Sequence, residues 1–459
     1  MTAMRIAVIG QGYVGVTGAV ALAQGGHQVT GVEQDAQRLA ALREGRAPVF
    51  EPGLQEELSL ALATGRLRFA RSVSPVHAEE PFDVVMVAVG TPPGPDGSAD
   101  LSQVTAAVQQ VTALVPAPLL VLKSTVPPGT SEMLLRGSPG LRDRYAYNPE
   151  FLNQGSALED WLAPSRVVVG VADRRNLPLL RQIHGHTGCP WVVTTPTSAE
   201  MVKYASNAFL ATKISFANEI ARLCAGPEFH VDQIMQGVGS DPRIGHAFLQ
   251  PGLGFGDSCL PKDTAALANW AAARGIRLPL LHAVREVNEG QPGMVAETLR
   301  RELGTALSRA RIAVLGVRYE PWSDDLRAAP SRTVIPGLMT EVAEVRVWDP
   351  EVDAETVTRL FPGAVPSPDL PSATDGAHAV VILTEWPEII EADWASLTPR
   401  LEAPRLIIDG KNCLYPGILQ SLPLLYRSTG NRFPLPTPTP AQLEVPPTVQ
   451  QPESRDGAG

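Results

Sequence analysis

The sequence predicts an α/β protein with two Rossmann-like, doubly wound domains, joined by a central helical segment that contains one long helix. Short apolar runs alternate with helical stretches over residues 4–171, and the same alternation returns over residues 310–409. This alternation is typical of parallel sheets whose two faces are covered by helices. Between the two regions, residues 197–223 contain neither proline nor glycine and predict a single helix of unusual length.

The chain is expected to have four segments. We predict a dinucleotide-binding domain over residues 1–196, a central helical domain over residues 197–304 and a second α/β domain over residues 305–432. Residues 433–459 are rich in proline and poor in apolar side chains, and a segment of this composition cannot bury enough apolar surface to fold. We therefore expect a disordered or polyproline II-like tail and assign it no catalytic role.

Composition excludes several classes of protein. The 459 residues carry a formal net charge of -10, which argues against nucleic acid or an anionic membrane surface as a partner. No apolar run is long enough to span a bilayer, and the first residues lack the pattern of a signal peptide. The four cysteines are far apart and predict neither a metal site nor a disulfide framework; they are Cys189, Cys224, Cys259 and Cys413. These features favour a cytoplasmic protein.

A glycine-rich loop follows the first expected strand, over residues 4–10, and precedes a helical stretch. Its glycines permit a tight turn and let a pyrophosphate approach the amino end of the helix; the loop consists of Gly10, Gln11, Gly12, Tyr13, Val14 and Gly15. Glu33 stands at the tip of the next expected strand, over residues 28–33. An acid there accepts hydrogen bonds from an adenine-ribose hydroxyl and repels a 2′-phosphate. The loop and Glu33 therefore predict NAD rather than NADP as the cofactor.

Polar side chains stand where the following strands are expected to end. Thr91 and Thr125 follow two of these apolar runs, and Glu150 follows Asn148 and Pro149. Ligands of open parallel sheets bind outside the carboxyl ends of the strands. Thr125 and Glu150 are therefore predicted to face the cofactor cleft. For Glu150 taken alone, a solvated loop carboxylate is the alternative.

The long helical stretch presents two polar side chains on one face. A Thr-Ser-Ala-Glu sequence at residues 197–200 reads as a capping box that opens the helix. Lys203 and Asn207 are four residues apart and share a face of that helix. An ammonium and an amide presented together can hold a developing oxyanion. Two solvated surface groups are the ordinary alternative.

The sequence PGLGFGDSCLPKD, over residues 251–263, predicts a reactive cysteine. Cys259 follows a glycine-rich segment over residues 252–256, and Pro261 suits the first turn of a helix. A thiol at a helix amino terminus, with Lys262 beside it, is placed where the thiolate is favoured. Asp263 is expected about one helical turn from the sulfur. Cys259 is therefore a candidate covalent nucleophile, and a buried free cysteine at a loop–helix junction is the alternative.

Residues 310–317 resemble a second Rossmann-type opening strand, although only Gly316 remains of the glycine pattern. Further strands are expected at residues 344–348, 378–383 and 405–409. Arg327 and Lys411 lie near strand ends and are able to pair with phosphates. Surface cations of no special role are the alternative for both.

Taken in order, the motifs of the chain resemble the UDP-glucose/GDP-mannose dehydrogenase family, whose members oxidise a nucleotide sugar twice. The resemblance covers residues 4–430. The matching motifs are GQGYVG with Glu33, EPGL at 51–54, VAVGTPPGPDGSADLS at 87–102, KSTVPPGT at 123–130, NPEFL at 148–152, EMVKYASNAF at 200–209, DPRIG at 241–245, the cysteine stretch, TEWPE at 384–388 and DGKN at 409–412.

The resemblance implies a mechanism in which a sugar C6 alcohol becomes a carboxylate with two NAD and one water. Cys259 would attack the intermediate aldehyde, giving a thiohemiacetal and then a thioester. Asp263 with Thr125 would position or activate the hydrolytic water, and Lys203 with Asn207 would stabilise the oxyanions. Glu150 would be the general base or an associated proton acceptor. Which carboxylate serves which step stays open.

Other site residues follow from the resemblance alone. Thr91 and Lys262 would join Thr125 near the cofactor. The nucleotide sugar would contact a larger set, namely Phe151, Leu152, Lys203, Asn207, Arg243, Phe255, Gly256, Arg327 and Lys411. Arg243 would reach the substrate site of a partner subunit, and the long helix would form the interface of a homodimer.

Four positions depart from the pattern of the family. Gln154 stands where a glutamate is frequent, and Asp257 replaces a glycine near Cys259, where an anion would raise the pKa of the thiol. Glu320 stands where a lysine usually helps to bind the nucleotide. Lys411 replaces an arginine, which grips a phosphate with two hydrogen bonds. We expect intact chemistry with an altered or weakened nucleotide-sugar site.

Three functions are consistent with these motifs. The first is an NAD-dependent UDP-glucose 6-dehydrogenase activity that forms UDP-glucuronate. The second is the same chemistry on GDP-mannose or a UDP-N-acetylhexosamine. The third is a protein that binds NAD or a nucleotide sugar without catalysis. The retained cysteine and its polar neighbours argue against the third.

Overall fold

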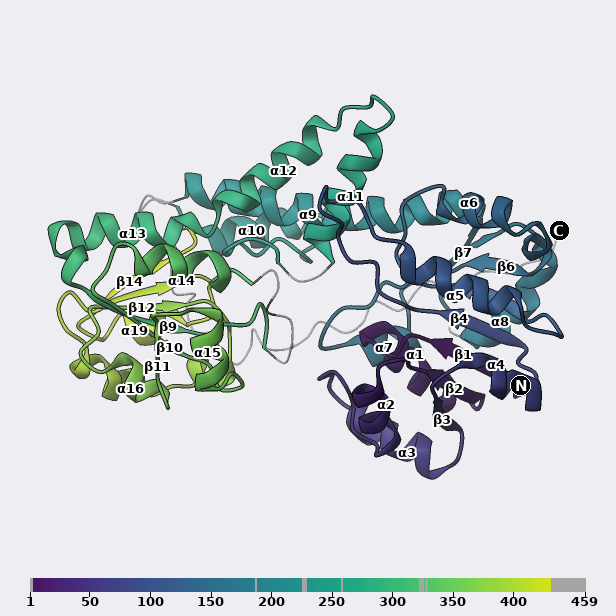
Figure 1. The fold of residues 1–459 in the computed structure, drawn as a ribbon. Helices are drawn as coiled ribbons and strands as arrows, with labels where there is room; N and C mark the ends of the chain where they lie inside the picture. Colours follow the sequence, from purple (N-terminus) through teal and green to yellow (C-terminus); the bar gives the residue numbers. More distant parts are fainter. Residues whose placement is uncertain are drawn as a thin grey trace, which may run out of the picture.

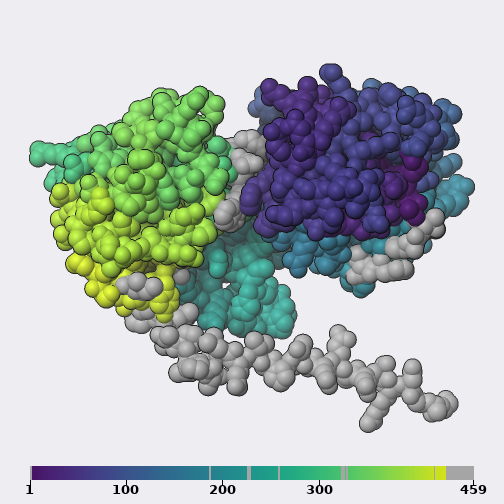
Figure 2. All heavy atoms as spheres, turned by 90° about the horizontal axis from the view of Figure 1, so that it is seen from below, coloured from purple at the N-terminus to yellow at the C-terminus, as the bar shows by residue number. Residues whose placement is uncertain are grey.

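The computed structural model describes residues 3–185, 188–224, 229–256, 259–321, 326 and 329–430. The chain forms two lobes, each built on a twisted sheet, and a set of helices runs between them (Figure 1). This arrangement confirms the predicted fold class. In the space-filling view the purple-to-blue lobe and the green-to-yellow lobe stand apart, and teal atoms of the helical segment join them (Figure 2).

The first lobe contains an eight-stranded sheet in the order β3-β2-β1-β4-β5-β6-β7-β8. All neighbouring strands are parallel except β6 and β7. The strands are β1 Arg5–Ile9, β2 Gln28–Val32, β3 Leu67–Ala70, β4 Val84–Val87, β5 Leu119–Leu122, β6 Tyr145–Tyr147, β7 Val167–Val171 and β8 Trp191–Thr194. Most of them are continuous apolar runs, because helices cover both faces of the sheet.

Two buried clusters fill the space between this sheet and its helices. One face packs against α1 Tyr13–Gln24, α2 Ala36–Arg43, α3 Leu54–Ala63, α7 Ala157–Leu162 and α8 Leu177–His184. The other face packs against α4 Val73–Glu79, α5 Ser102–Thr112 and α6 Thr130–Gly137. The predicted helix at residues 54–63 matches α3.

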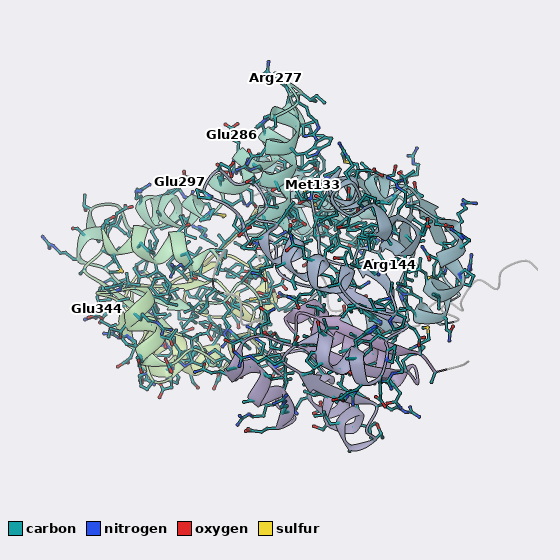
Figure 3. The ribbon with its side chains drawn as sticks, turned by 45° about the vertical axis from the view of Figure 1, so that its right-hand side comes forward. Met133, Arg144, Arg277, Glu286, Glu297 and Glu344 are labelled. Atoms are coloured by element: carbon teal, nitrogen blue, oxygen red, sulfur yellow. The ribbon has the colours of Figure 1, made fainter. Side chains whose placement is uncertain are left out.

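The central segment is helical and begins with the long helix α9 Pro196–Leu223, which runs from the first lobe toward the second (Figure 1). The helices after it are α10 Val231–Gly239, α11 Leu260–Ala272, α12 Pro279–Gly290 and α13 Gly293–Leu303. Both α11 and α12 pack on α9. Arg277 marks the tip of the hairpin between α11 and α12, and Glu286 and Glu297 lie along the outer side of the segment (Figure 3).

The second lobe contains a six-stranded parallel sheet in the order β11-β10-β9-β12-β13-β14. Its strands are β9 Arg311–Leu315, β10 Glu344–Trp348, β11 Val365–Pro366, β12 Ala379–Ile382, β13 Leu406–Asp409 and β14 Leu425–Ser428. Its helices are α14 Ser331–Met339, α15 Ala354–Leu360, α16 Leu370–Thr374, α17 Pro387–Ile390, α18 Trp394–Leu397 and α19 Pro416–Leu419. Within residues 3–430, apart from the undescribed gaps, no helix is long and apolar enough to cross a membrane.

The start of α9 differs from the sequence prediction. The N-cap is Thr195, whose side chain accepts a hydrogen bond from the Ser198 amide, and Pro196 occupies the first turn. Glu200 does not complete a capping box. Its carboxylate instead accepts hydrogen bonds from the amides of Gly129 and Ser131, both at 2.6 Å, at the start of α6. Glu200 lies on the buried face of α9, where it caps the first turn of α6 instead of the start of its own helix.

Candidate active site

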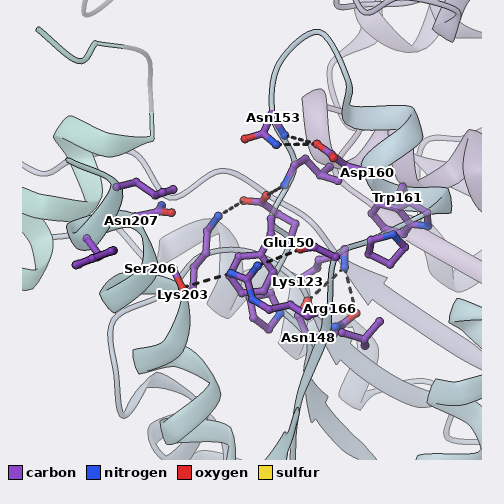
Figure 4. Close-up of a pocket in the computed structure, with 18 of the residues that line it drawn as sticks. Lys123, Asn148, Glu150, Asn153, Asp160, Trp161, Arg166, Lys203, Ser206 and Asn207 are labelled. Atoms are coloured by element: carbon purple, nitrogen blue, oxygen red, sulfur yellow. Dashed lines mark hydrogen bonds and ion pairs between the residues drawn. The ribbon is translucent and has the colours of Figure 1, made fainter. Parts of the chain in front are cut away.

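A cavity of about 780 Å³ lies between the two lobes. Its walls come from the start of α1, the middle of α9, the loop before α11 and loops of the second sheet. Cys259 lines this cavity together with Lys203 and Asn207. A second cavity of about 570 Å³ adjoins the first, and both are lined by Glu150 and Lys203 (Figure 4). The predicted nucleophile is therefore close to the predicted polar groups of α9.

The glycine-rich loop has the geometry that a dinucleotide needs. A β-carbon at Gly15 would lie 1.8 Å from the carbonyl oxygen of Gly10, and Gly10 has φ +90°. At Gly12, by contrast, a β-carbon would meet no atom within 4 Å. Gly10 and Gly15 thus permit the close turn, while Gly12 leaves open space at the amino end of α1. That end favours an anion, so the loop fits the pyrophosphate of NAD.

Glu33 is held at the end of β2. Its carboxylate accepts hydrogen bonds from the amides of Gln11 (3.2 Å) and Asp35 (2.9 Å), and it pairs with Arg38 at 3.3 Å. The contact with Gln11 places the acid directly beside the glycine-rich loop. This is where the ribose hydroxyls of a bound dinucleotide are expected.

Glu150 and Lys203 form a buried ion pair. The Lys203 ammonium lies 3.0 Å from Glu150 Oε1, and the two side chains point toward one another (Figure 4). Burial by itself favours the neutral acid, but attraction to Lys203 and a hydrogen bond from the Leu152 amide lower the pKa of Glu150. Burial likewise opposes the charge on Lys203, yet Glu150, then Cys259 and Asp263, raise the pKa of Lys203. The pair is therefore a fixed cation and anion at the edge of the cavity.

A second polar chain links α9, α11 and two strand ends of the first sheet. Asp263 is 2% exposed and accepts hydrogen bonds from Asn207 Nδ2 and Lys262 Nζ, both at 2.6 Å. Lys262 Nζ also lies 3.5 Å from Thr91 Oγ1, which donates to the carbonyl oxygen of Thr125 at 2.9 Å. The fold thus brings five sequence-predicted residues into one connected network.

Behind Glu150 lies a cluster that sequence reasoning did not select. Lys123 is buried; its ammonium donates to Asn148 Oδ1 at 3.1 Å and lies 4.3 Å from the centre of the Trp161 ring. His184 Nε2 donates to the same Asn148 oxygen at 2.9 Å. Burial, opposed by Glu150 and reinforced by Lys203, lowers the pKa of Lys123 to about 7. Lys123 and Asn148 occur in predicted strand-end motifs, but no local pattern indicated His184.

The other predicted substrate residues take different positions. Phe151 lines the smaller cavity, Leu152 lines both and Gly256 lines the larger one. The Phe255 ring instead packs with Ala211 and Val284 in a small core, and Phe255 lines neither cavity. Asn288 holds the backbone of residue 255 from both groups: its Oδ1 accepts from the Phe255 amide at 2.6 Å, and its Nδ2 donates to the Phe255 carbonyl oxygen at 2.9 Å.

Arg243 lines neither cavity within the part of the chain that the structure describes. It bonds Asp241 of its own loop, and its side chain is 87% exposed. Arg327 and Asp257 lie outside the described residues.

Family models match along most of the chain. They are the NAD binding domain of the UDP-glucose/GDP-mannose dehydrogenase family at residues 4–187, its central domain at 197–290 and its UDP binding domain at 313–416. The chain belongs to the UDP-glucose/GDP-mannose dehydrogenase family. The resemblance inferred from the motifs is thereby confirmed.

Similar proteins agree with this assignment. A UDP-glucose 6-dehydrogenase of Pseudomonas aeruginosa is 39% identical over 93% of this chain and 97% of its own length. One from Bacillus subtilis is 38% identical over 95% and 99%. The solved UDP-glucose dehydrogenase of Pyrobaculum islandicum is 36% identical, with a TM-score of 0.84 over 94% of this chain and 98% of its own. The protein is an NAD-dependent oxidoreductase, as predicted.

The second lobe supplies the far wall of the cavity in this family member. Lys411 Nζ lies 3.0 Å from Glu385 and also donates to the carbonyl oxygen of Tyr319 at 3.0 Å. Burial opposes the charge, but Glu385, then Tyr319 and Glu320, raise the pKa of Lys411. Glu320 and Glu385 both line the cavity. The Lys411 ammonium is therefore already engaged by a carboxylate of the cavity wall.

Proposed function

We propose that this dehydrogenase oxidises the C6 alcohol of UDP-glucose to the carboxylate of UDP-glucuronate. The observation that carries the proposal is the position of Cys259 beside Lys203 and Asn207 in a cavity that reaches the second lobe. The overall balance is one alcohol, one water and two NAD giving one carboxylate, two NADH and three protons. The UDP-glucose 6-dehydrogenases that match over more than nine-tenths of the chain support this sugar.

The chain's own residues provide the groups for two successive oxidations. Gly10, Gly12 and Gly15 would hold NAD at the first sheet, where the cofactor would supply the hydride acceptor for each oxidation. After the first, the Cys259 thiolate adds to the C6 aldehyde, and the thiohemiacetal holds the reactive carbon in place. Loss of a second hydride forms a thioester, and water then displaces the sulfur. The cysteine thus keeps a free aldehyde from leaving the cavity.

Two polar groups of α9 support these steps. The Lys203 ammonium and the Asn207 amide are placed to stabilise negative charge on the sugar oxygen. Glu150 is the general base in this scheme, and Asp263 holds Asn207 and Lys262 in position. Because Glu150 is paired with Lys203, it remains an unprotonated acceptor at neutral pH.

The yield of NADH tests the proposal directly. With NAD in excess and UDP-glucose limiting, about two NADH should form per sugar. GDP-mannose and UDP-N-acetylglucosamine are assayed in parallel. Two NADH from one of those sugars, and none from UDP-glucose, would assign the same chemistry to another substrate. Absence of NADH from all three, with NAD still bound, would support a role without catalysis.

A Cys259→Ala variant tests the covalent step. We expect it to lose turnover by roughly a thousandfold or more while it still binds NAD, because the substitution leaves the glycine-rich loop and Glu33 unchanged. Cys189→Ala is the matched control, since Cys189 lines neither cavity. Unchanged carboxylate formation by Cys259→Ala would disprove the thioester route.

We also infer a homodimer that forms through α9. Three large apolar side chains stand seven residues apart on this helix and are exposed, namely Phe209 (66%), Phe216 (45%) and Leu223 (71%). Residues at this spacing share one helical face. Phe216→Glu should convert the dimer to a monomer in sedimentation measurements. Wild-type protein that sediments as a monomer would overturn the inference.

A further inference from the structure

The EPGL motif at residues 51–54 has no part in the chemistry above, yet its glutamate is deeply buried. Glu51 is 4% exposed and lies just before α3. It does not line either of the two cavities. Its carboxylate accepts hydrogen bonds from the hydroxyl of Tyr13 and from the amides of Gly155 (2.9 Å) and Ala157 (2.7 Å). A single carboxylate thus joins two segments that are more than a hundred residues apart.

These two segments face the two ligands. Tyr13 belongs to the glycine-rich loop and begins α1, where the pyrophosphate of NAD is expected. Gly155 lies near the end of the loop that starts at Glu150, and Ala157 begins α7 directly after this loop. Residues 152–154 of the loop line the large cavity. The Tyr13 hydroxyl also lies 3.3 Å from the carbonyl oxygen of Asn153. Glu51 is therefore located where the cofactor loop and the sugar-side loop meet.

The bonding of Glu51 is strong enough to fix both loops. Hydrogen bonds to a charged acceptor are about twice as strong as those between neutral groups. Both amides that donate to Glu51 belong to the backbone, so the segment that contains them cannot shift without breaking these hydrogen bonds. Asn153 is held independently by Asp160, which accepts from its amide at 2.8 Å and from its side chain at 3.0 Å (Figure 4). Loss of Glu51 should hence release the link between the loops while Asp160 keeps the sugar-side loop folded.

We propose that Glu51 is a positioning residue that couples the NAD-binding loop to the loop carrying Glu150. NAD bound at the first loop stabilises Tyr13, and Tyr13 stabilises the sugar-side loop through Glu51. By thermodynamic linkage the nucleotide sugar must strengthen NAD binding by the same factor. The coupling to the sugar rests on the proposed function, whereas the coupling between NAD and the loop does not.

Amide hydrogen exchange with NAD alone tests the inference without any sugar. In the wild type, NAD should slow exchange at residues 152–157 by about fivefold or more, a typical size for coupling between sites. In Glu51→Gln, NAD should leave the exchange rate of residues 152–157 nearly unchanged, while it still slows exchange at the start of α1. Equal protection of residues 152–157 in both proteins, or none in the wild type, would overturn the proposal.

Kinetics separate positioning from a merely structural role. Glu51→Gln should lower kcat/KM for the nucleotide sugar by about tenfold with a small change in the thermal midpoint. Tyr13→Phe should give part of this loss, and the double variant no more than Glu51→Gln alone, because the two groups act as one unit. Glu56→Gln, on the exposed side of α3, is the matched control.

The outcomes distinguish this inference from the proposed function. If UDP-glucose yields no NADH, the proposed substrate fails, but the exchange experiment with NAD still decides the role of Glu51. Should Glu51→Gln not fold, Tyr13→Phe removes one arm of the contact and keeps the carboxylate with its two amides. Full loop protection in that variant would then overturn the proposal.

Discussion

The two sheets share a topology but differ at the point where a ligand binds. The order β3-β2-β1-β4-β5 of the first lobe recurs as β11-β10-β9-β12-β13 in the second. Gly10 and Gly316 both end the first strand of their sheets with positive φ, +90° and +87°. Their amides donate to the ends of the neighbouring strands, at Val32 (2.9 Å) and Trp348 (2.8 Å). The opening turns of the two lobes are thus built in the same way.

The acid after the second strand shows the difference. Glu33 and Asp349 each accept a hydrogen bond from the amide of the residue that follows the positive-φ glycine of their lobe. The donors are Gln11 (3.2 Å) and Val317 (2.7 Å). Asp349 also accepts from the indole of Trp386, which is fully buried. In the first lobe the acid adjoins the open space at Gly12, whereas in the second an indole occupies its free side. One topology therefore makes a cofactor site in one lobe and a packed wall in the other.

The largest expected difference concerns glycines in the first helix after each opening strand. Gly15→Ala would place a β-carbon 1.8 Å from the Gly10 carbonyl oxygen, so the loop must open. We expect loss of NAD binding and a fall in kcat/KM of roughly a thousandfold. Gly337→Ala in α14 meets no atom within 4 Å and should retain full activity. Isothermal titration with NAD measures both, and normal NAD affinity in Gly15→Ala would contradict the comparison.

The two acids should separate binding from stability. Glu33→Ala is expected to weaken NAD binding by about tenfold, since it removes the acceptor for the ribose hydroxyls. Asp349→Asn should leave NAD affinity unchanged and cost about 1–3 kcal/mol of stability, because two buried donors lose a charged acceptor. Titration with NAD and with NADP, together with thermal unfolding, checks both. A preference of the wild type for NADP would refute the role assigned to Glu33.

The smallest expected effect is a response to acid that is confined to the first lobe. Burial, then repulsion from Lys123, lowers the pKa of His184 to about 3. Below about pH 6.5 this imidazole is protonated in the unfolded chain but stays neutral in the folded chain. The free energy of unfolding therefore falls as the pH drops from about 6.5 toward 3.

At pH 5.5, amide exchange in β6 should therefore accelerate relative to β12, after correction for the intrinsic rates. His184→Gln keeps a donor for Asn148 and should remove the acceleration, with a difference in thermal midpoint on the order of 2 °C. The same acid response in this variant would show that other groups cause it.

Much of the site could be predicted from local sequence. The glycine-rich loop, Glu33, the strand-end threonines and the helix that follows Cys259 are all short-range patterns. Each of these patterns is set by the backbone geometry of a few neighbouring residues or by their position at the end of a strand. It can therefore be recognised without knowledge of the fold. The roles assigned to these side chains remain predictions, whereas their proximity is now a structural observation.

Other features could not be predicted, because their partners are distant in the chain. Glu51 bonds residues about a hundred positions away, and His184 contacts Asn148 from another element. Glu200 had the spacing of a capping box, but the first turn of α6 offered it buried amides instead. No local pattern carries that information.

By itself, the sequence determined the two α/β repeats, the family and the need for NAD, since periodicity and ordered motifs are properties of contiguous residues. Only the tertiary structure decided that Glu150 is paired with Lys203, that Phe255 packs inward and that Lys411 is held by Glu385. The physical reason is that burial and charge pairing depend on which segments the fold brings together. The sequence specifies the chemical type of each side chain, but the tertiary structure determines which groups it contacts.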